Sequence, residues 1–104
     1  MASSPTQRTL ALLRKEGWNA EVTEKWIPGA NIRKDLWGFI DVLAIRGKEI
    51  LGVQATSYTN TSTRVKKIED SDNVAAVREA GIGIHVHGWR KVKHRWQVRI
   101  VDCS

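Results

Sequence analysis

Two polar side chains interrupt a pair of apolar segments between residues 38 and 57. The acid Asp41 lies in GFIDVLAI, and the amide Gln54 lies in LGVQATS, two residues before Thr56. We expect a two-residue turn at Arg46-Gly47 to join these segments as a hairpin. That register pairs Asp41 with Gly52 and places Gln54 diagonally across on the same face. A four-residue turn keeps this arrangement, whereas a three-residue turn separates the two side chains.

An acid, an amide oxygen and a hydroxyl would then converge beside the gap left by a glycine. Oxygen ligands suit Mg²⁺, which is often held by one or two carboxylates together with waters and substrate phosphate. Such an ion neutralises a phosphodiester oxygen and lowers the pKa of an attacking water. The structural alternative is that Asp41 forms a buried hydrogen-bonded pair and Gln54 satisfies backbone groups. Spacing alone favours this alternative.

The surrounding pattern predicts the elements that would position these groups. Apolar alternation from Trp18 to Trp26 is typical of a strand and puts Glu24 on its apolar side. Glu24 is therefore either a third acid of the site or a partner of Arg64 or another base. Asp35 is expected to cap or brace its loop, with a place in the site as the alternative. The elements expected in this half are a helix over 5–16, strands over 18–26, 37–45 and 49–56, and a loop over 28–35.

The second half of the chain predicts one helical region and two strands. The helical pattern begins near Thr63 and stops at Gly81. His85 and His87 then share one side of a strand, where we expect a solvent-facing pair, because no third zinc ligand presents itself. A basic turn over 88–94 leads to a last strand over 95–100. The predicted order is α-β-β-β-α-β-β.

These segments and their order resemble the PD-(D/E)XK nuclease superfamily, whose core order is α-β-β-β-α-β. That family carries an acid in its second strand and an acid-x-lysine motif in its third. GFIDVLAI is similar to the first part, with Asp41 as the acid. LGVQATS is similar to the second, with Gln54 at the acid position and Thr56 at the lysine position. The segment DLWGFIDVLAIRGKEILGVQATS is more similar to small, phage-type members with a Gln-x-Thr third motif.

The resemblance implies one restriction-endonuclease-like domain over residues 1–104, an α/β fold whose mixed central sheet is flanked by helices and extended by a C-terminal strand. It also implies a DNA endonuclease that depends on Mg²⁺ or Mn²⁺. Threonine replaces the lysine that orients the attacking water, so Lys66 or Lys67 of the following helix would substitute for it. The catalytic residues expected from the resemblance are Asp41, Gln54, Thr56 and Glu24, and the metal ligands are Asp41, Gln54 and Glu24.

Basic residues indicate a polyanionic partner. The chain has 17 Lys and Arg against 11 Asp and Glu, a formal charge of +6, and small basic domains often bind nucleic acid. The segment GWRKVKHRW mixes bases with tryptophan, which suits backbone contacts and base stacking. The structural alternative for Arg64, Lys66 and Lys67 is a solvated helix face. The alternative for GWRKVKHRW is a charged hairpin that protects a sheet edge. The residues expected to bind DNA are Arg33, Lys34, Arg64, Lys66, Lys67, Arg90, Lys91 and Lys93.

Composition argues against several other classes of protein. A hydrophobic content of 41% is too high for a disordered chain, and no apolar run is long enough to cross a membrane. The start, MASSPTQRTL, lacks the pattern of a signal peptide. The single cysteine, Cys103, cannot form an intrachain disulfide and gives little support to a cysteine–histidine metal site. These features are typical of a reducing, cytoplasmic setting.

Two other functions compete with the nuclease. The first is a catalytically inactive module of the same fold that binds nucleic acid or a partner, and Thr56 is the residue that favours it. The second is a double-stranded-RNA-binding domain, which shares the order α-β-β-β-α. That domain needs no polar pair on central strands and leaves the residues after Gly81 unexplained.

For a DNA endonuclease, cutting two strands usually needs two sites, which suggests a homodimer.

Overall fold

A mixed sheet of five strands is the centre of the fold, and its strand order is β1-β4-β5-β6-β7. The computed structural model describes residues 4–104 and, at Arg33, the backbone alone. Only β5 and β6 run parallel, and the other neighbouring strands are antiparallel. The strands of this sheet are β1 (Asn19–Val22), β4 (Val42–Arg46), β5 (Glu49–Ser57), β6 (Gly83–Val92) and β7 (Arg95–Asp102).

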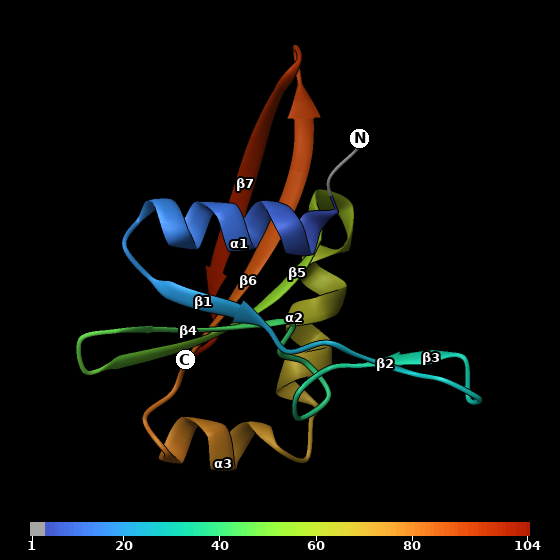
Figure 1. Ribbon diagram of the computed structural model, residues 1–104, viewed down its shortest axis with the longest axis vertical. Helices are drawn as coiled ribbons and strands as arrows, with labels where there is room; N and C mark the ends of the chain where they lie inside the picture. Colours follow the sequence, from blue (N-terminus) through green and yellow to red (C-terminus); the bar gives the residue numbers. More distant parts are fainter. Residues whose placement is uncertain (1–3) are drawn as a thin grey trace.

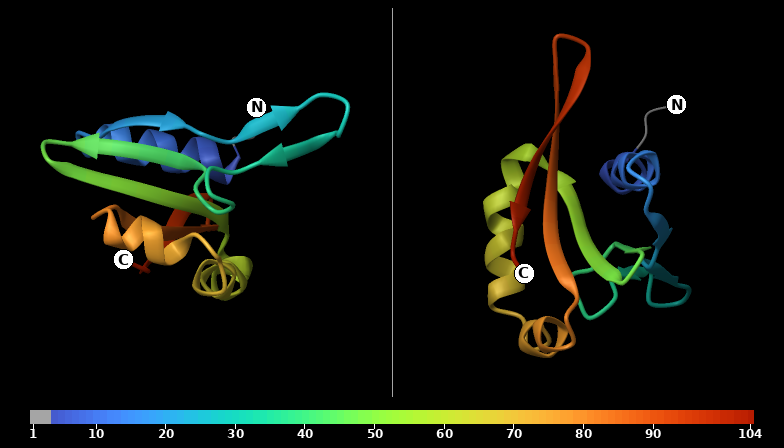
Figure 2. Two further views of the ribbon diagram at one scale, coloured as in Figure 1. Left: turned by 90° about the horizontal axis from the view of Figure 1, so that it is seen from below. Right: turned by 90° about the vertical axis from the view of Figure 1, so that its left-hand side faces the viewer.

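Helices cover both faces of this sheet (Figures 1 and 2). Helix α1 (Pro5–Lys15) lies on one face, where Leu10 and Leu13 pack against Val42 and Val53. The Ser4 hydroxyl caps this helix by accepting a hydrogen bond from Gln7 N at 3.2 Å. On the other face lie α2 (Thr61–Glu69), preceded by the short helix η1 (Tyr58–Asn60), and α3 (Val74–Glu79).

The second face has a core of its own. Ile68 of α2 and Val77 of α3 pack against Ile84 and Val86 of β6. Side chains alternate along a strand, so β5 gives Val53 to the α1 face and Gln54 to the opposite face. The predicted α/β class, with a mixed sheet flanked by helices and one more strand at the C-terminal end, is confirmed as a single-domain fold.

Two hairpins project from the body of the molecule (Figure 1). The larger consists of the outer halves of β6 and β7. The smaller is a separate two-stranded sheet of β2 (Lys25–Ile27) and β3 (Ile32–Lys34). No helix within residues 4–104 is both long and apolar enough to cross a membrane.

The smaller hairpin corrects two predictions. The strand expected over 18–26 breaks at Thr23, whose hydroxyl donates to Ile40 O at 2.8 Å and whose amide donates to Asp41 O at 2.8 Å. Glu24 therefore lies in the link between β1 and β2, and not within a continuous strand. The loop expected over 28–35 contains β3, because the chain reverses after Ile27 and pairs back on β2.

Turn geometry explains two further differences. The strand expected over 37–45 begins only at Val42, because Trp37 and Gly38 have φ values of 53° and 85° and form a tight turn. The basic turn expected over 88–94 is mostly strand. Only Lys93 and His94 form the turn, with φ values of 48° and 66°, as in the two-residue turns that join twisted strands.

Candidate metal centre

The hairpin of β4 and β5 brings Asp41 and Gln54 together. Its turn has two residues, an even number as predicted, but they are Gly47 and Lys48, since Arg46 pairs with Glu49. The ladder ends at the Val42–Val53 pair, and beyond it the Asp41 carboxylate meets the Gln54 side chain. The predicted convergence of these two side chains is therefore confirmed.

The expected gap beside Asp41 is absent. Gly52 pairs with Leu43 and not with Asp41, because the turn lies one residue later than predicted. The space above Gly52 is filled by Ile40, whose Cδ1 atom would lie 2.5 Å from a Cβ at position 52. Glycine at this position thus admits a core side chain and leaves no room for a ligand.

Asp41 is an almost fully buried acid held by hydrogen bonds from β5. Its exposed fraction is 4%. The Oδ2 atom accepts from the backbone N–H of Ala55 at 2.8 Å and from Gln54 Nε2 at 3.0 Å. These donors fix the carboxylate at the point where β4 begins, beside the far end of β5.

Two more carboxylates approach Asp41 from other segments. Glu24, in the link between β1 and β2, and Asp35, directly after β3, each offer an oxygen, and the three ligand atoms lie within 4.8 Å of one another. The β2–β3 hairpin makes this possible, because it carries the chain out after Glu24 and returns it at Asp35. Asp35 thus belongs to the cluster, which was the alternative to its expected role as a loop cap.

The environment raises the pKa of Asp41 to about 7. Burial is the largest cause, followed by a side-chain hydrogen bond with Asp35 and by the negative charges of Asp35 and Glu24. The hydrogen bond from the Ala55 amide acts in the opposite direction. A carboxylate in this position is stabilised either by a proton or by a cation that offsets its neighbours.

Gln54 adds a buried side-chain oxygen next to Asp41. Its side chain is 3% exposed, and Nε2 donates to Asp41, but Oε1 is buried without a hydrogen-bond partner within residues 4–104. Leaving such an oxygen unsatisfied costs about 1–3 kcal/mol. Carboxylate and amide oxygens are hard ligands, so the donor set fits Mg²⁺ or Mn²⁺.

A lysine also reaches the cluster, from the second face of the sheet. Lys67 Nζ of α2 lies 3.8 Å from Asp35 Oδ2. Thr56 is buried two residues beyond Gln54 on β5, but the described hydrogen bonds of Asp41 run to Gln54, Ala55 and Asp35 and not to Thr56. Lys67, one of the two lysines that the resemblance offered as a substitute, therefore lies beside Asp35.

The other basic residues fall into separate groups. Lys34 and its cross-strand partner Lys25 line a cavity of about 230 Å³ together with Asp35. Arg64 and Lys66 are on α2, while Arg90, Lys91 and Lys93 are on the projecting β6–β7 hairpin or its turn. The side chain of Arg33, also expected to bind DNA, lies outside the described residues. Lys25 is absent from the basic residues predicted to bind DNA, because it was expected to lie within one long strand over 18–26.

The expected solvent-facing histidine pair is wrong for His87, whereas the side chain of His85 is 29% exposed. His87 is 1% exposed and lies beneath α1, where its Nδ1 atom is 3.1 Å from Thr9 Oγ1. Trp89 Nε1 donates to the same hydroxyl at 2.9 Å. Burial, and then the charge of His85, lower the pKa of His87 to about 4. His87 thus takes part in packing the helix on the sheet.

Comparison of the chain with protein-family models, curated proteins and solved structures found no match.

The raised pKa of Asp41 predicts a pH-dependent stability in metal-free protein. The folded state binds this proton more tightly than the unfolded chain, so the stabilisation is complete below about pH 4 and is lost as the pH rises to about 7. Asp41→Asn removes the titration and keeps an oxygen that can accept from Ala55. We expect the free energy of unfolding of the wild type to fall by on the order of 2–4 kcal/mol relative to this variant between pH 4.5 and pH 8, since a tenfold change in proton affinity is about 1.4 kcal/mol.

Urea unfolding in the presence of EDTA measures this difference, and Asp72→Asn at an exposed acid is the control. Parallel stability curves for the wild type and Asp41→Asn would contradict the burial of an acid that holds a proton.

Proposed function

We propose that this chain is a metal-dependent nuclease that hydrolyses phosphodiester bonds in DNA at the Glu24–Asp35–Asp41 cluster. The observation that carries the proposal is the convergence of three carboxylates from three chain segments within 4.8 Å, beside the orphaned oxygen of Gln54. Glu24, Asp35 and Asp41 would hold Mg²⁺ or Mn²⁺, with Gln54 Oε1 as a further oxygen or as a partner of a bound water. When bound, the ion supplies charge neutralisation at a phosphate and a water of lowered pKa.

The residues of the chain have separate roles in this proposal. Asp41 would hold the cation as a carboxylate, and its hydrogen bonds from Ala55 and Gln54 keep the carboxylate oriented. Lys67, positioned through Asp35, adds a positive charge on the side of the site that faces α2. Such a fixed charge stabilises the extra negative charge that develops on the phosphate during water attack.

The resemblance to the PD-(D/E)XK superfamily agrees with this assignment. The element order is similar to the α-β-β-β-α-β core when β2, β3, η1 and α3 are taken as insertions and β7 as an added C-terminal strand. We therefore propose a restriction-endonuclease-like fold with its site on the β4–β5 hairpin. The formal charge of +6 supports DNA as the substrate, and a homodimer would supply the two sites that two-strand cutting usually needs.

A second candidate is an inactive module of the same fold that binds nucleic acid without cutting it. Thr56 at the position of the motif lysine favours this candidate. The approach of Lys67 to Asp35 favours an active site, because it places the positive charge of a lysine beside the cluster from α2.

Metal binding and cleavage test the proposed function together. The wild type should melt at a higher temperature with millimolar Mg²⁺ or Mn²⁺, because a ligand bound only by the folded state stabilises it by mass action. It should also cut at least one of linear duplex, nicked, branched and single-stranded DNA. Asp41→Asn should fold, lose cleavage and lose the response of its melting temperature to the metal.

A wild type that binds DNA but neither responds to these metals nor cuts any of the four DNA forms would favour the inactive module.

Adjacent lysines on α2 provide a matched pair of variants. Lys67→Met removes the charge beside Asp35 and should lower the cleavage rate about 100-fold or more, the typical cost of losing one group that stabilises transition-state charge. Its melting temperature should still rise with Mg²⁺, since the carboxylates remain. Lys66→Met, at an exposed position one residue earlier, is the control for the loss of a DNA-binding charge on α2 and should lower the cleavage rate far less than Lys67→Met. Equal rates for the two variants would remove Lys67 from the proposed mechanism.

A further inference from the structure

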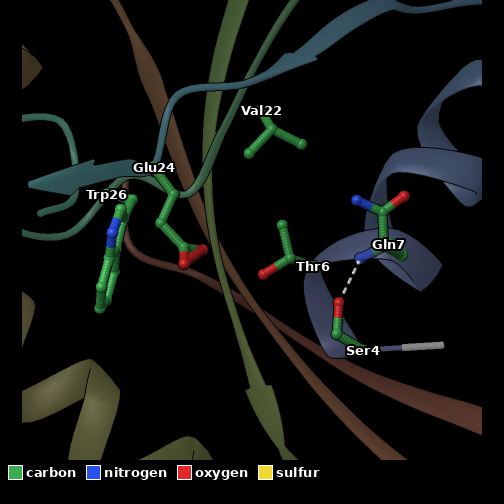
Figure 3. Close-up of a pocket in the computed structure, with 6 residues that line it drawn as sticks. All are labelled: Ser4, Thr6, Gln7, Val22, Glu24 and Trp26. Atoms are coloured by element: carbon green, nitrogen blue, oxygen red, sulfur yellow. Dashed lines mark hydrogen bonds between the residues drawn. The ribbon is translucent and has the colours of Figure 1, made fainter. Parts of the chain in front are cut away.

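A cavity of about 260 Å³ lies between the first turn of α1 and the link that leads into β2 (Figure 3). The lining combines hydroxyl, amide, carboxylate, aliphatic and aromatic groups from two segments, residues 4–7 and 22–26. The lining residues are Ser4, Thr6, Gln7, Val22, Glu24 and Trp26.

This cavity shares one residue, Glu24, with the carboxylate cluster. Figure 3 shows the Glu24 carboxylate between the ring of Trp26 and the hydroxyl of Thr6. The same Glu24 side chain offers one of the three ligand oxygens that lie within 4.8 Å of one another. A molecule in the cavity would therefore touch the edge of the proposed metal site.

Trp26 is the feature of the cavity that points to a ligand. It is 54% exposed, although burying an indole is strongly favourable and aromatic rings dominate binding energetics. Trp96 on the other hairpin is also partly exposed, but the Arg8 guanidinium stacks 3.3 Å from its ring centroid. Trp26 instead forms a wall of a cavity that contains polar groups.

The chemistry of the lining matches a planar ring with polar edges. A nucleobase stacks on an aromatic side chain for about 1–3 kcal/mol, largely independent of sequence. The Thr6 hydroxyl and Gln7 amide can both donate and accept hydrogen bonds at the edge of such a ring, and Val22 adds an apolar contact. The volume lies below the roughly 300–1,000 Å³ of pockets for drug-sized ligands, so it suits one base and not a duplex segment.

We infer that this cavity binds an unpaired nucleobase of the substrate strand, stacked on Trp26, with the adjoining phosphate at the carboxylate cluster. The inference rests on the proposed nuclease function and specifies its substrate as DNA with at least one unpaired nucleotide. A base within a continuous duplex cannot enter, because both of its faces are covered by neighbouring bases. An aromatic wall beside the metal site thus selects single-stranded or locally opened DNA.

Binding by the full chain in CaCl2 tests this inference, with wild type, Trp26→Ala and Trp26→Phe compared by fluorescence anisotropy. The probes are a single-stranded oligonucleotide and the matched duplex, each at one fixed salt concentration. Trp26→Ala should weaken single-strand binding roughly tenfold or more. Trp26→Phe should retain most of that affinity, because a smaller aromatic ring still stacks. Duplex affinity should be the same in all three proteins.

Ile45→Ala is the control, since Ile45 is an apolar side chain that is 48% exposed and lies near the end of β4 that is remote from Asp41. It should bind both probes like the wild type, and circular dichroism should show that every variant is folded. Wild-type affinity of Trp26→Ala for the single strand, or an equal loss for both probes, would overturn the inference.

The two proposals fail in different ways. If the wild type cuts DNA with Mg²⁺ but Trp26→Ala behaves as the wild type in binding, the base pocket is wrong and the nuclease stands. If Trp26→Ala shows the selective loss and no DNA form is cut with Mg²⁺ or Mn²⁺, the base pocket stands and the nuclease is wrong.

Discussion

The buried carboxylate of Asp41 is the constraint on which the rest of the site depends. Burial of an ionised acid is costly unless hydrogen bonds and an opposite charge compensate it. The Ala55 amide and the Gln54 side chain give Asp41 two donors, but Asp35 and Glu24 add negative charge within 4.8 Å. A proton can relieve this repulsion in the metal-free chain, and a divalent cation can relieve it more completely. The cluster thus carries unfavourable electrostatic repulsion in the metal-free chain, and our proposal is that a cation relieves it.

The fold creates this constraint by bringing several segments together at one end of the neighbouring strands β4 and β5. Antiparallel pairing of β4 with β5 places Asp41 beside Gln54, and the excursion through β2 and β3 returns the chain at Asp35. The helix after β5 then packs on the second face and carries Lys67 to Asp35. Hydrophobic contacts on the two faces fix these elements, so the polar groups are positioned by the cores and not by their own hydrogen bonds alone.

The local sequence pattern correctly predicted the parts of the structure that depend on residues close in the sequence. The helix α1, the strand β5 and the meeting of Asp41 with Gln54 follow from apolar periodicity, a cap and an even turn. The role of Asp35 and the burial of His87 could not be predicted in the same way. Asp35 reaches the cluster only because residues 36–40 turn back through two residues of positive φ, and His87 is buried only because α1 crosses its strand. Both depend on contacts between segments that are distant in sequence.

Diffraction from crystals soaked in MnCl2 tests the central claim most directly, because anomalous scattering locates manganese without reference to activity. The account predicts one strong anomalous peak within coordination distance of oxygens from Asp41, Glu24 and Asp35. It also predicts that the Asp41–Asp35 hydrogen bond is replaced by contacts to the ion. Density without a peak at the cluster, with Asp41 still hydrogen-bonded to Asp35, would contradict a metal centre at this site.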